Sequence, residues 1–289
     1  MKVLVTGVGG QLGHDVMNEL KKRGHTAIGT DVQGDHDLLL DITDAVAVKT
    51  AVASVQPDAV IHCAAWTAVD AAEDCPEKVR TINAGGTANL AAACKEIGCK
   101  MMYISTDYVF DGQGEAPWQP DCKAYQPLNV YGQTKLEGEL AVVQALDKYF
   151  FVRIAWVFGK NGKNFVKTML SLSEKYEELR VVCDQIGTPT YTFDLARLLV
   201  DMIETDKYGY YHATNEGGYI SWYDFACEIF RQAGKNTRVQ AVTTAEYGLS
   251  KAARPFNSRL DKSKLVKAGF RPLPSWQDAL SRYLKEIEE

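Results

Sequence analysis

A tyrosine and a lysine, Tyr131 and Lys135, stand four residues apart in the segment Asn129–Lys135. At this spacing the two side chains share one face of a helix. A tyrosine hydroxyl can donate a proton to a developing alkoxide, and a nearby ammonium favours the ionised ring, so the pair suits reduction of a carbonyl group. A third polar group must orient that carbonyl, and Thr106, at the end of a predicted strand, is our candidate.

A glycine-rich turn near the start of the chain indicates where a hydride donor would bind. Gly7, Gly10 and Gly13 follow a predicted strand, Lys2–Thr6, and open a predicted helix, Gln11–Arg23. A side chain at the turn would block a pyrophosphate, and one at Gly13 would hold the helix away from the strand. The pattern predicts dinucleotide binding.

Asp31 ends the second predicted strand, Thr26–Asp31. Its carboxylate would accept hydrogen bonds from an adenosine ribose and repel a 2′-phosphate. We therefore expect NADH or NADPH as cofactor, with NADH favoured. The alternative is that Asp31 is an ordinary turn residue at the end of a strand.

Short apolar runs alternate with helical patterns in the first half of the chain, which predicts an α/β fold with a Rossmann-like, doubly wound parallel sheet. Strands are expected at Lys2–Thr6, Thr26–Asp31, Ala59–Ala65, Lys100–Ser105 and Phe150–Trp156. Helices are expected at Gln11–Arg23, Glu77–Ile97 and Val130–Leu146.

The pattern changes after Trp156. Helices are expected there at Phe165–Tyr176, Thr192–Ile203, Ser221–Ala233 and Trp276–Glu288, with a strand at Arg180–Cys183. We expect a dinucleotide-binding domain over residues 1–158. Residues 159–289 would form a smaller, partly discontinuous C-terminal substrate lobe, of which about 180–206 return to the main sheet.

The composition limits the partners. The 289 residues are 46% hydrophobic, and the net charge of −5 comes without clusters of Lys and Arg, which argues against nucleic acid and anionic membranes. Seven cysteines without a Cys-x-x-Cys pair are expected as reduced thiols. The chain enters a strand at once, and no apolar stretch approaches the ~20 residues of a membrane span, so we expect a cytoplasmic protein.

Taken together, the motifs resemble the extended short-chain dehydrogenase/reductase superfamily. Along nearly its whole length the chain resembles the dTDP-4-dehydrorhamnose reductase family. The resembling segments are Gly10–Gly13, Cys63–Asp70 with Ala72–Glu73, Ser105–Phe110, Pro127–Gly132, Asp184–Thr190 and Arg254–Leu260. The resemblance implies hydride transfer to the 4-keto group of dTDP-4-dehydro-L-rhamnose, which gives dTDP-L-rhamnose.

The resemblance also implies roles for single residues. Cofactor contacts would come from Gly7, Gly10, Gln11, Leu12, Gly13, Asp31, Asp41, Ile42, Ala65, Trp66, Thr67, Asn83, Tyr131 and Lys135. Catalysis would rest on Thr106, Tyr131 and Lys135, and the sugar would contact Thr106, Asp107 and Trp156. Arg254 and Arg259 are candidates for binding the diphosphate or ordering its loop, with surface salt bridges as the alternative.

Three positions depart from related patterns. Dehydratases of the superfamily follow the aspartate with a glutamate, where this chain has Tyr108. Asp107 alone cannot supply an acid and a base, so dehydration is disfavoured. Some family members form dimers through magnesium bound by glutamates, but here Asp15 and Phe193 stand at two such positions. A phenyl ring cannot ligate magnesium, so we predict no metal site and leave monomer or homodimer open.

Two other functions stay open on the sequence. The regulatory subunit of methionine adenosyltransferase resembles these reductases and acts by binding, without turnover. A reductase of a related nucleotide-linked 4-keto sugar would share the same chemistry. The presence of Thr106, Tyr131 and Lys135 favours an enzyme.

Overall fold

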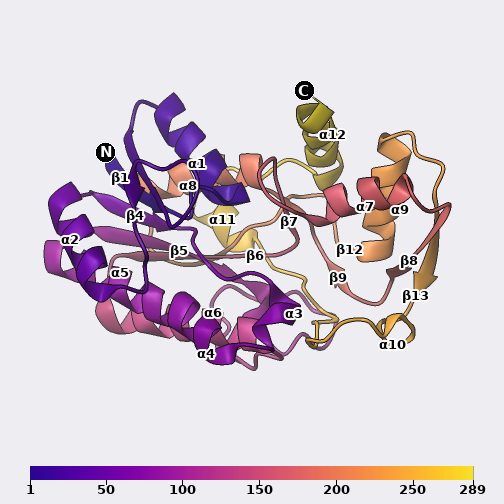
Figure 1. The fold of residues 1–289 in the computed structure, drawn as a ribbon, viewed down its shortest axis with the longest axis horizontal. Helices are drawn as coiled ribbons and strands as arrows, with labels where there is room; N and C mark the ends of the chain where they lie inside the picture. Colours follow the sequence, from indigo (N-terminus) through magenta and orange to yellow (C-terminus); the bar gives the residue numbers. More distant parts are fainter. Residues whose placement is uncertain (289) are drawn as a thin grey trace.

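A seven-stranded sheet lies at the centre of the computed structural model, which describes residues 1–288 (Figure 1). Every strand of this sheet runs parallel to its neighbours. In spatial order the strands are β11 (Gly209–His212), β6 (Tyr149–Ile154), β5 (Lys100–Thr106), β4 (Ala59–His62), β1 (Lys2–Thr6), β2 (Thr26–Asp31) and β3 (Leu38–Leu39). The predicted Rossmann-like parallel sheet is confirmed.

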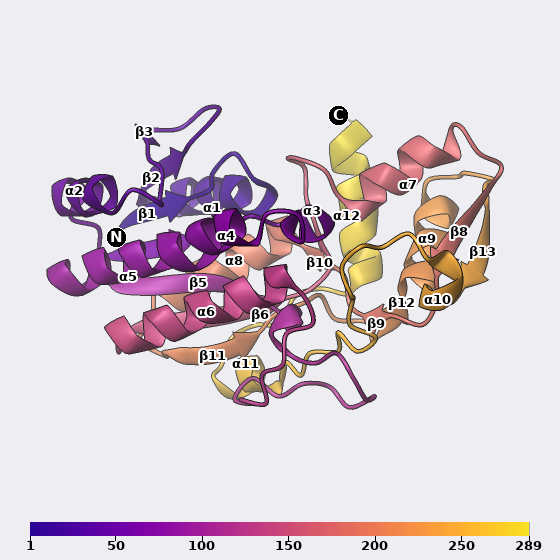
Figure 2. The same cartoon turned by 60° about the horizontal axis from the view of Figure 1, so that its bottom comes forward.

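Helices cover both faces of the sheet, as parallel crossovers require (Figure 2). One face packs against α1 (Gln11–Lys22), α8 (Thr192–Ile203) and α11 (Ser263–Lys267). The other packs against α2 (Ala45–Val55), α5 (Gly86–Ile97) and α6 (Val130–Ala145). Alternate residues of each strand point to opposite faces, so Val3 and Val5 join the first core and Leu4 joins the second.

Three predicted elements differ from the structure next to the clefts described below. The strand predicted over Phe150–Trp156 is β6 and ends at Ile154, so Ala155 and Trp156 leave the sheet and line the second cleft. β4 ends at His62, not at Ala65, because the chain leaves the sheet there to line both clefts. The helix predicted over Glu77–Ile97 begins as α4 (Pro76–Arg80) and passes through a π-helical turn, Thr81–Gly85, before α5. Such π turns occur often at functional sites.

The second half of the chain builds a lobe on the right of Figure 1. Its core joins α7 (Phe165–Ser173), α9 (Trp222–Gln232) and α12 (Trp276–Glu288) with the parallel pair β8 (Glu178–Val182) and β13 (Arg238–Val242). Two short pairs, β7 (Val157–Phe158) with β10 (Thr190–Tyr191) and β9 (Ile186–Gly187) with β12 (Ile220–Ser221), lie between this lobe and the main sheet. The other short helices are α3 (Val69–Ala72) and α10 (Thr244–Tyr247).

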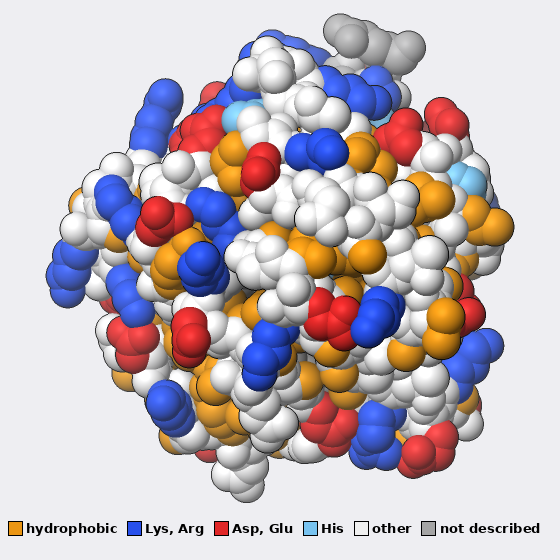
Figure 3. Space-filling model, turned by 90° about the vertical axis from the view of Figure 1, so that its left-hand side faces the viewer, with side chains coloured by type: hydrophobic (Ala, Val, Ile, Leu, Met, Phe, Trp, Pro, Cys, Tyr) orange, Lys and Arg blue, Asp and Glu red, His pale blue; other side chains and the backbone are white. Residues whose placement is uncertain are grey.

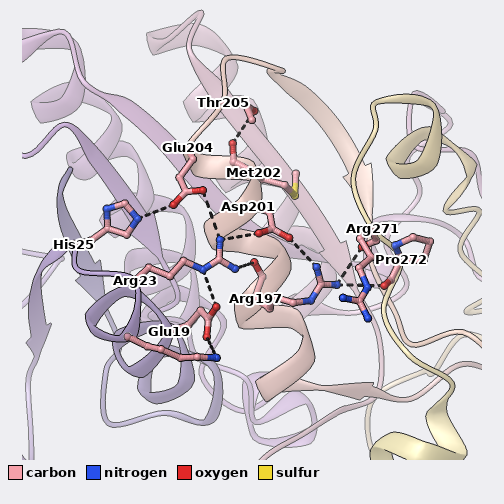
Figure 4. A network of polar contacts seen from close by, with 11 residues as sticks. Glu19, Arg23, His25, Arg197, Asp201, Met202, Glu204, Thr205, Arg271 and Pro272 are labelled. Atoms are coloured by element: carbon pink, nitrogen blue, oxygen red, sulfur yellow. Dashed lines mark hydrogen bonds and ion pairs between the residues drawn. The ribbon is translucent and has the colours of Figure 1, made fainter.

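Segments of the second half also complete the first. α8 packs with α1 in the core on one face, and β11 pairs with β6 at the edge of the main sheet. Figure 4 shows the polar network between α1 and α8, in which Arg23 donates to Asp201 at 2.7 Å and to the carbonyl oxygen of Arg197 at 3.1 Å. The division of the chain into two domains at residue 158 therefore stays a prediction, because segments that follow residue 158 also belong to the main sheet and the helices that cover it.

The surface shows no gathering of one charge on the face in Figure 3, where acidic and basic side chains are interspersed. Among residues 1–288, no helix combines the length and the apolar character needed to cross a membrane.

Candidate active site

Two adjoining clefts open at the carboxyl ends of the parallel strands, where ligands of such sheets bind. The first, of about 730 Å³, lies over the ends of β1, β2 and β3. The second, of about 450 Å³, lies over the ends of β5 and β6. The lining of both includes Gly7, Gly10, Cys63 and Ala65, so the clefts are continuous.

Glycines at the turn between β1 and α1 let the backbone of the turn and the helix pack closely at the floor of the clefts. Gly7 has φ of +72°, and a Cβ there would lie 2.6 Å from the amide nitrogen of Ala64. A Cβ at Gly13 would lie 2.2 Å from the carbonyl oxygen of Gly7, so only glycine allows this packing of helix on turn. No side chain caps α1 at Gly10, and its first amides can receive a phosphate.

Asp31 lines the first cleft, and its carboxylate also holds the turn. Oδ2 accepts a hydrogen bond from the Gly9 amide at 2.9 Å, and Oδ1 accepts one from the Val32 amide at 2.7 Å. The Asp31 carboxylate therefore stabilises the backbone of the turn and also faces the cleft in which a ligand would bind.

Other predicted cofactor residues surround these clefts. Asp41, Ile42, Ala65 and Trp66 line the first cleft, and Gln11, Leu12, Gly13, Ala65 and Thr67 line the second. Asn83 is different, because it is buried in the π-helical turn behind the lining. Its Oδ1 accepts from the Trp66 amide at 2.8 Å and its Nδ2 donates to the Trp66 carbonyl oxygen at 3.2 Å, so it positions Trp66.

Lys135 reaches the second cleft from α6 and is almost fully buried. Its Nζ donates to the carbonyl oxygen of Ile104 at 2.7 Å and lies 4.1 Å from the ring centre of Tyr103. Burial lowers the pKa of Lys135 to about 7, although the charge of Glu139 opposes this change.

Tyr131 and Thr106 meet in the same cleft. Burial raises the pKa of Tyr131, and a hydrogen bond with Thr106 only partly offsets this rise. We expected Lys135 to favour the tyrosinate, whereas burial, the largest influence on the Tyr131 pKa, favours the protonated ring. Tyr131 is therefore protonated at neutral pH.

Asp107 follows Thr106 in a single 3₁₀ turn and is 2% exposed. Its Oδ1 accepts from the Thr106 hydroxyl at 3.0 Å, while its Oδ2 makes no hydrogen bond within residues 1–288. Burial raises the pKa of Asp107 to about 6. A buried acceptor at the cleft wall without a partner is suited to a ligand hydroxyl.

Trp156 lines the second cleft in an unusual backbone conformation, with φ of +52°. Its ring stacks on Trp222 of α9, with centroids 3.7 Å apart and planes 14° apart. Trp222 and Lys163, which also line the cleft, were not predicted. Neither belongs to a motif near the glycine turn or the Tyr–Lys pair, so only the packing of the lobe brings them there.

Arg254 and Arg259 lie outside the lining of both clefts as far as residues 1–288 are described. Arg254 donates to Asp70 at 2.6 Å and to the hydroxyl of Tyr108 at 3.4 Å. Arg259 donates to Asn257 at 3.1 Å. Arg254 thus forms the kind of salt bridge named as the alternative, whereas the partner of Arg259 is an uncharged amide, and a role of either residue at the diphosphate stays a prediction.

Asp15 and Phe193 stand at the two positions where some family members have glutamates that bind magnesium. Asp15 is buried and accepts from the hydroxyl of Thr192, while Phe193 is 52% exposed. Within residues 1–288 no three His, Cys, Asp or Glu side chains come together as a metal site.

A chain with this sheet, this glycine turn and a Thr–Tyr–Lys cleft at its carboxyl edge is a nicotinamide-dependent oxidoreductase of the short-chain dehydrogenase/reductase class. The family model described as RmlD substrate binding domain matches residues 1–289, and the chain belongs to that family.

Known proteins of similar sequence and structure agree with this assignment. The spore coat polysaccharide biosynthesis protein SpsK of Bacillus subtilis is 40% identical over 285 residues, covering 99% of this chain and 97% of that protein. A dTDP-4-dehydrorhamnose reductase of Streptomyces griseus is 42% identical over 284 residues, covering 96% and 91%. The structure of a Bacillus anthracis dTDP-4-dehydrorhamnose reductase in complex with NADP matches with a TM-score of 0.93 at 41% identity, covering 99% of both chains. The predicted family and enzyme class are confirmed.

Proposed function

We propose that the protein reduces the 4-keto group of dTDP-4-dehydro-L-rhamnose to give dTDP-L-rhamnose, with NADH or NADPH as hydride donor. The observation that carries the chemistry is the meeting of Thr106, Tyr131 and Lys135 in a cleft continuous with the glycine-turn cleft. The relatives named above supply the substrate, because the residues determine the reaction better than the sugar.

In this proposal Tyr131 donates the proton and Thr106 orients the carbonyl. The raised pKa of Tyr131 keeps the hydroxyl protonated, which is the form that reduction requires. This role for Thr106 is supported by its position in the same cleft as Tyr131 and by its hydrogen bond to Asp107, which fixes the hydroxyl. A bound nicotinamide supplies the hydride. Lys135, beneath the cleft, would contact its ribose and return a proton to Tyr131.

The residues present fit a dinucleotide. Glycines let the turn and α1 pack closely, and no side chain caps the first amides of α1, whose residues Gly10 and Gln11 line the clefts. We propose that NADH is favoured, because the Asp31 carboxylate faces the first cleft and would repel a 2′-phosphate. The exposed cation Lys78 lines the same cleft and would moderate that repulsion, so NADPH would bind as well.

The test is oxidation of NADH and NADPH with a panel of dTDP-, UDP- and GDP-linked 4-keto sugars. We expect turnover to be fastest with dTDP-4-dehydro-L-rhamnose. Absence of turnover with every sugar nucleotide, despite cofactor binding, would instead indicate a binding protein.

The variant Tyr131→Phe isolates the proton donor. It keeps the ring and removes the hydroxyl, so we expect turnover to fall by roughly 10²-fold or more with NADH affinity within about threefold of wild type. Stopped-flow measurement of NADH oxidation and a fluorescence titration give the two values. Unchanged turnover would remove Tyr131 from the mechanism.

A further inference from the structure

The short helix α3 lies beside the chain that follows α10 (Figures 1 and 2). It comes directly after the cleft residues Trp66 and Thr67 and carries Asp70, with Glu73 at its end. Neither carboxylate has a role in the proposed reaction. Both make contacts that concern the catalytic helix α6.

Glu73 holds the first residue of α6. Its Oε1 accepts a hydrogen bond from the Val130 amide at 2.9 Å. Asn129 caps the same helix, because its Oδ1 accepts from the Gly132 amide at 2.8 Å. Acceptors at this end satisfy amides that the helix leaves free, and they fix the turn that carries Tyr131.

Asp70 holds the loop Ser250–Arg254, which approaches the same helix end. Its Oδ1 accepts from the amides of Lys251 and Ala252 at 3.1 and 3.0 Å, and its Oδ2 accepts from Arg254 at 2.6 Å. Asn129 completes the connection by donating from Nδ2 to the carbonyl oxygen of Ala253 at 2.8 Å. One carboxylate therefore organises a loop that is bonded to the cap of α6.

Tyr108 extends this arrangement to the reacting group. Its hydroxyl accepts from Arg254, and its ring packs edge-on against Tyr131 with centroids 5.6 Å apart. A Cβ at Gly132 would lie 2.3 Å from the Tyr108 carbonyl oxygen, so the 3₁₀ turn and α6 are in close contact. Removing Arg254 from Tyr108 would free one side of the Tyr131 ring.

We propose that Asp70 is a positioning residue for the reaction: it holds Arg254 against Tyr108 and the loop against the cap of α6, and so keeps Tyr131 in its donating orientation. This rests on the proposed role of Tyr131. Because Arg254 lies outside the lining of both clefts, Asp70 acts on proton transfer more than on substrate affinity.

The experiment compares Asp70→Ala with Asp74→Ala. Asp74 pairs with Lys251 of the same loop, but both side chains of that pair are more than half exposed. For Asp70→Ala we expect kcat to fall about tenfold or more, with KM for the sugar nucleotide and NADH affinity within about threefold, and the solvent deuterium isotope effect on kcat to rise above about 2. Asp70→Asn keeps an acceptor for the loop amides, so its kcat should lie between those of wild type and Asp70→Ala. Asp74→Ala should match wild type.

A second measurement does not need turnover. Hydrogen exchange at the first turn of α6 should be faster in Asp70→Ala than in Asp74→Ala, with NADH binding at full stoichiometry in both. Equal exchange in the two variants would overturn the proposal. So would a lower kcat that comes with reduced NADH stoichiometry and an unchanged isotope effect, because that pattern reports partial unfolding. An inactive wild type would overturn the proposed function instead, and the exchange result would still decide the role of Asp70.

Discussion

The ammonium group of Lys135 is buried away from water. Its burial lowers the stability of the folded protein by an amount that depends on pH. Its pKa is about 7 in the folded protein against an ordinary value of 10.5. Below pH 7 both states carry the proton and the full cost of burial remains. As pH rises from 7 to 10.5 the folded state releases its proton first, so stability rises, and above 10.5 the cost is gone.

We predict that Lys135→Met stabilises the protein at pH 6 by about 1–3 kcal/mol, even though the bond to Ile104 is lost, and that this gain shrinks towards pH 10. Urea unfolding of both proteins at several pH values measures it. Lys95→Met, at an exposed position on α5, serves as control and should show no such trend. A gain of the same size at pH 6 and pH 10 would contradict the argument.

Asp31 can be tested through its charge alone. Asp31→Asn removes the charge and keeps an acceptor for one of the two backbone amides, so the preference for NADH over NADPH should fall by roughly 1–3 kcal/mol. Fluorescence titration of each cofactor into wild type and variant measures the ratio. Asp35→Asn changes a neighbouring exposed carboxylate and should leave the ratio alone. If the ratio of the NADH and NADPH affinities is also unchanged in Asp31→Asn, Asp31 serves only to hold the turn.

How far the sequence predicts the site depends on where each residue sits in the fold. Asp31, Thr106 and Trp156 could be placed together because parallel strands present their carboxyl ends at one edge. Trp222 could not, since its position depends on how α9 packs in a separate core. The same limit applies to Arg254, whose motif does not tell whether it binds a ligand or Asp70.

The elements that were not predicted include α2 and β11, for different reasons. α2 has the sequence Ala45–Val55, rich in valine, and lacks a clear apolar stripe; the Asp44 side chain, which accepts from the Val46 and Ala47 amides, marks its start. β11 is only four residues long, and pairing with β6 makes it a strand. α1 and α8 were predicted well because their apolar faces repeat at helical spacing.

The contact between α1 and α8 can be tested at Arg23 (Figure 4). This side chain is 23% exposed and donates to Glu19, Asp201 and the Arg197 carbonyl oxygen. We expect Arg23→Ala to lower the free energy of unfolding by about 1–3 kcal/mol, because several partly buried acceptors lose a partner.

Arg231 is the matched control for Arg23. It pairs with Glu228 within α9 and is 70% exposed, so Arg231→Ala should leave the free energy of unfolding close to that of wild type. Urea unfolding compares the two. Equal effects would mean that the network between α1 and α8 adds nothing beyond ordinary surface pairs.

The two halves of the molecule meet where Trp156 at the sheet edge stacks on Trp222 of the lobe. Trp222→Leu removes this stack and one wall of the second cleft, so we expect KM for the sugar nucleotide to rise roughly tenfold while NADH affinity stays near wild type. Trp222→Phe, which keeps an aromatic ring, should recover most of the loss.

The circular dichroism of two stacked indoles offers an independent check of this contact. The exciton couplet should disappear in Trp222→Leu and persist in Trp118→Phe. A rise in KM with the couplet intact would assign the effect to something other than the stack.

The position of β11 has a consequence for the chain as it leaves the ribosome. β6 ends at Ile154, yet the strand that covers its outer edge starts only at Gly209. Until that strand emerges, the nascent protein carries an open strand edge with Phe150, Phe151 and Val152, a template for pairing with other chains. Translation of the lobe segments between them is thus the interval in which this strand edge stays open to pairing with another chain.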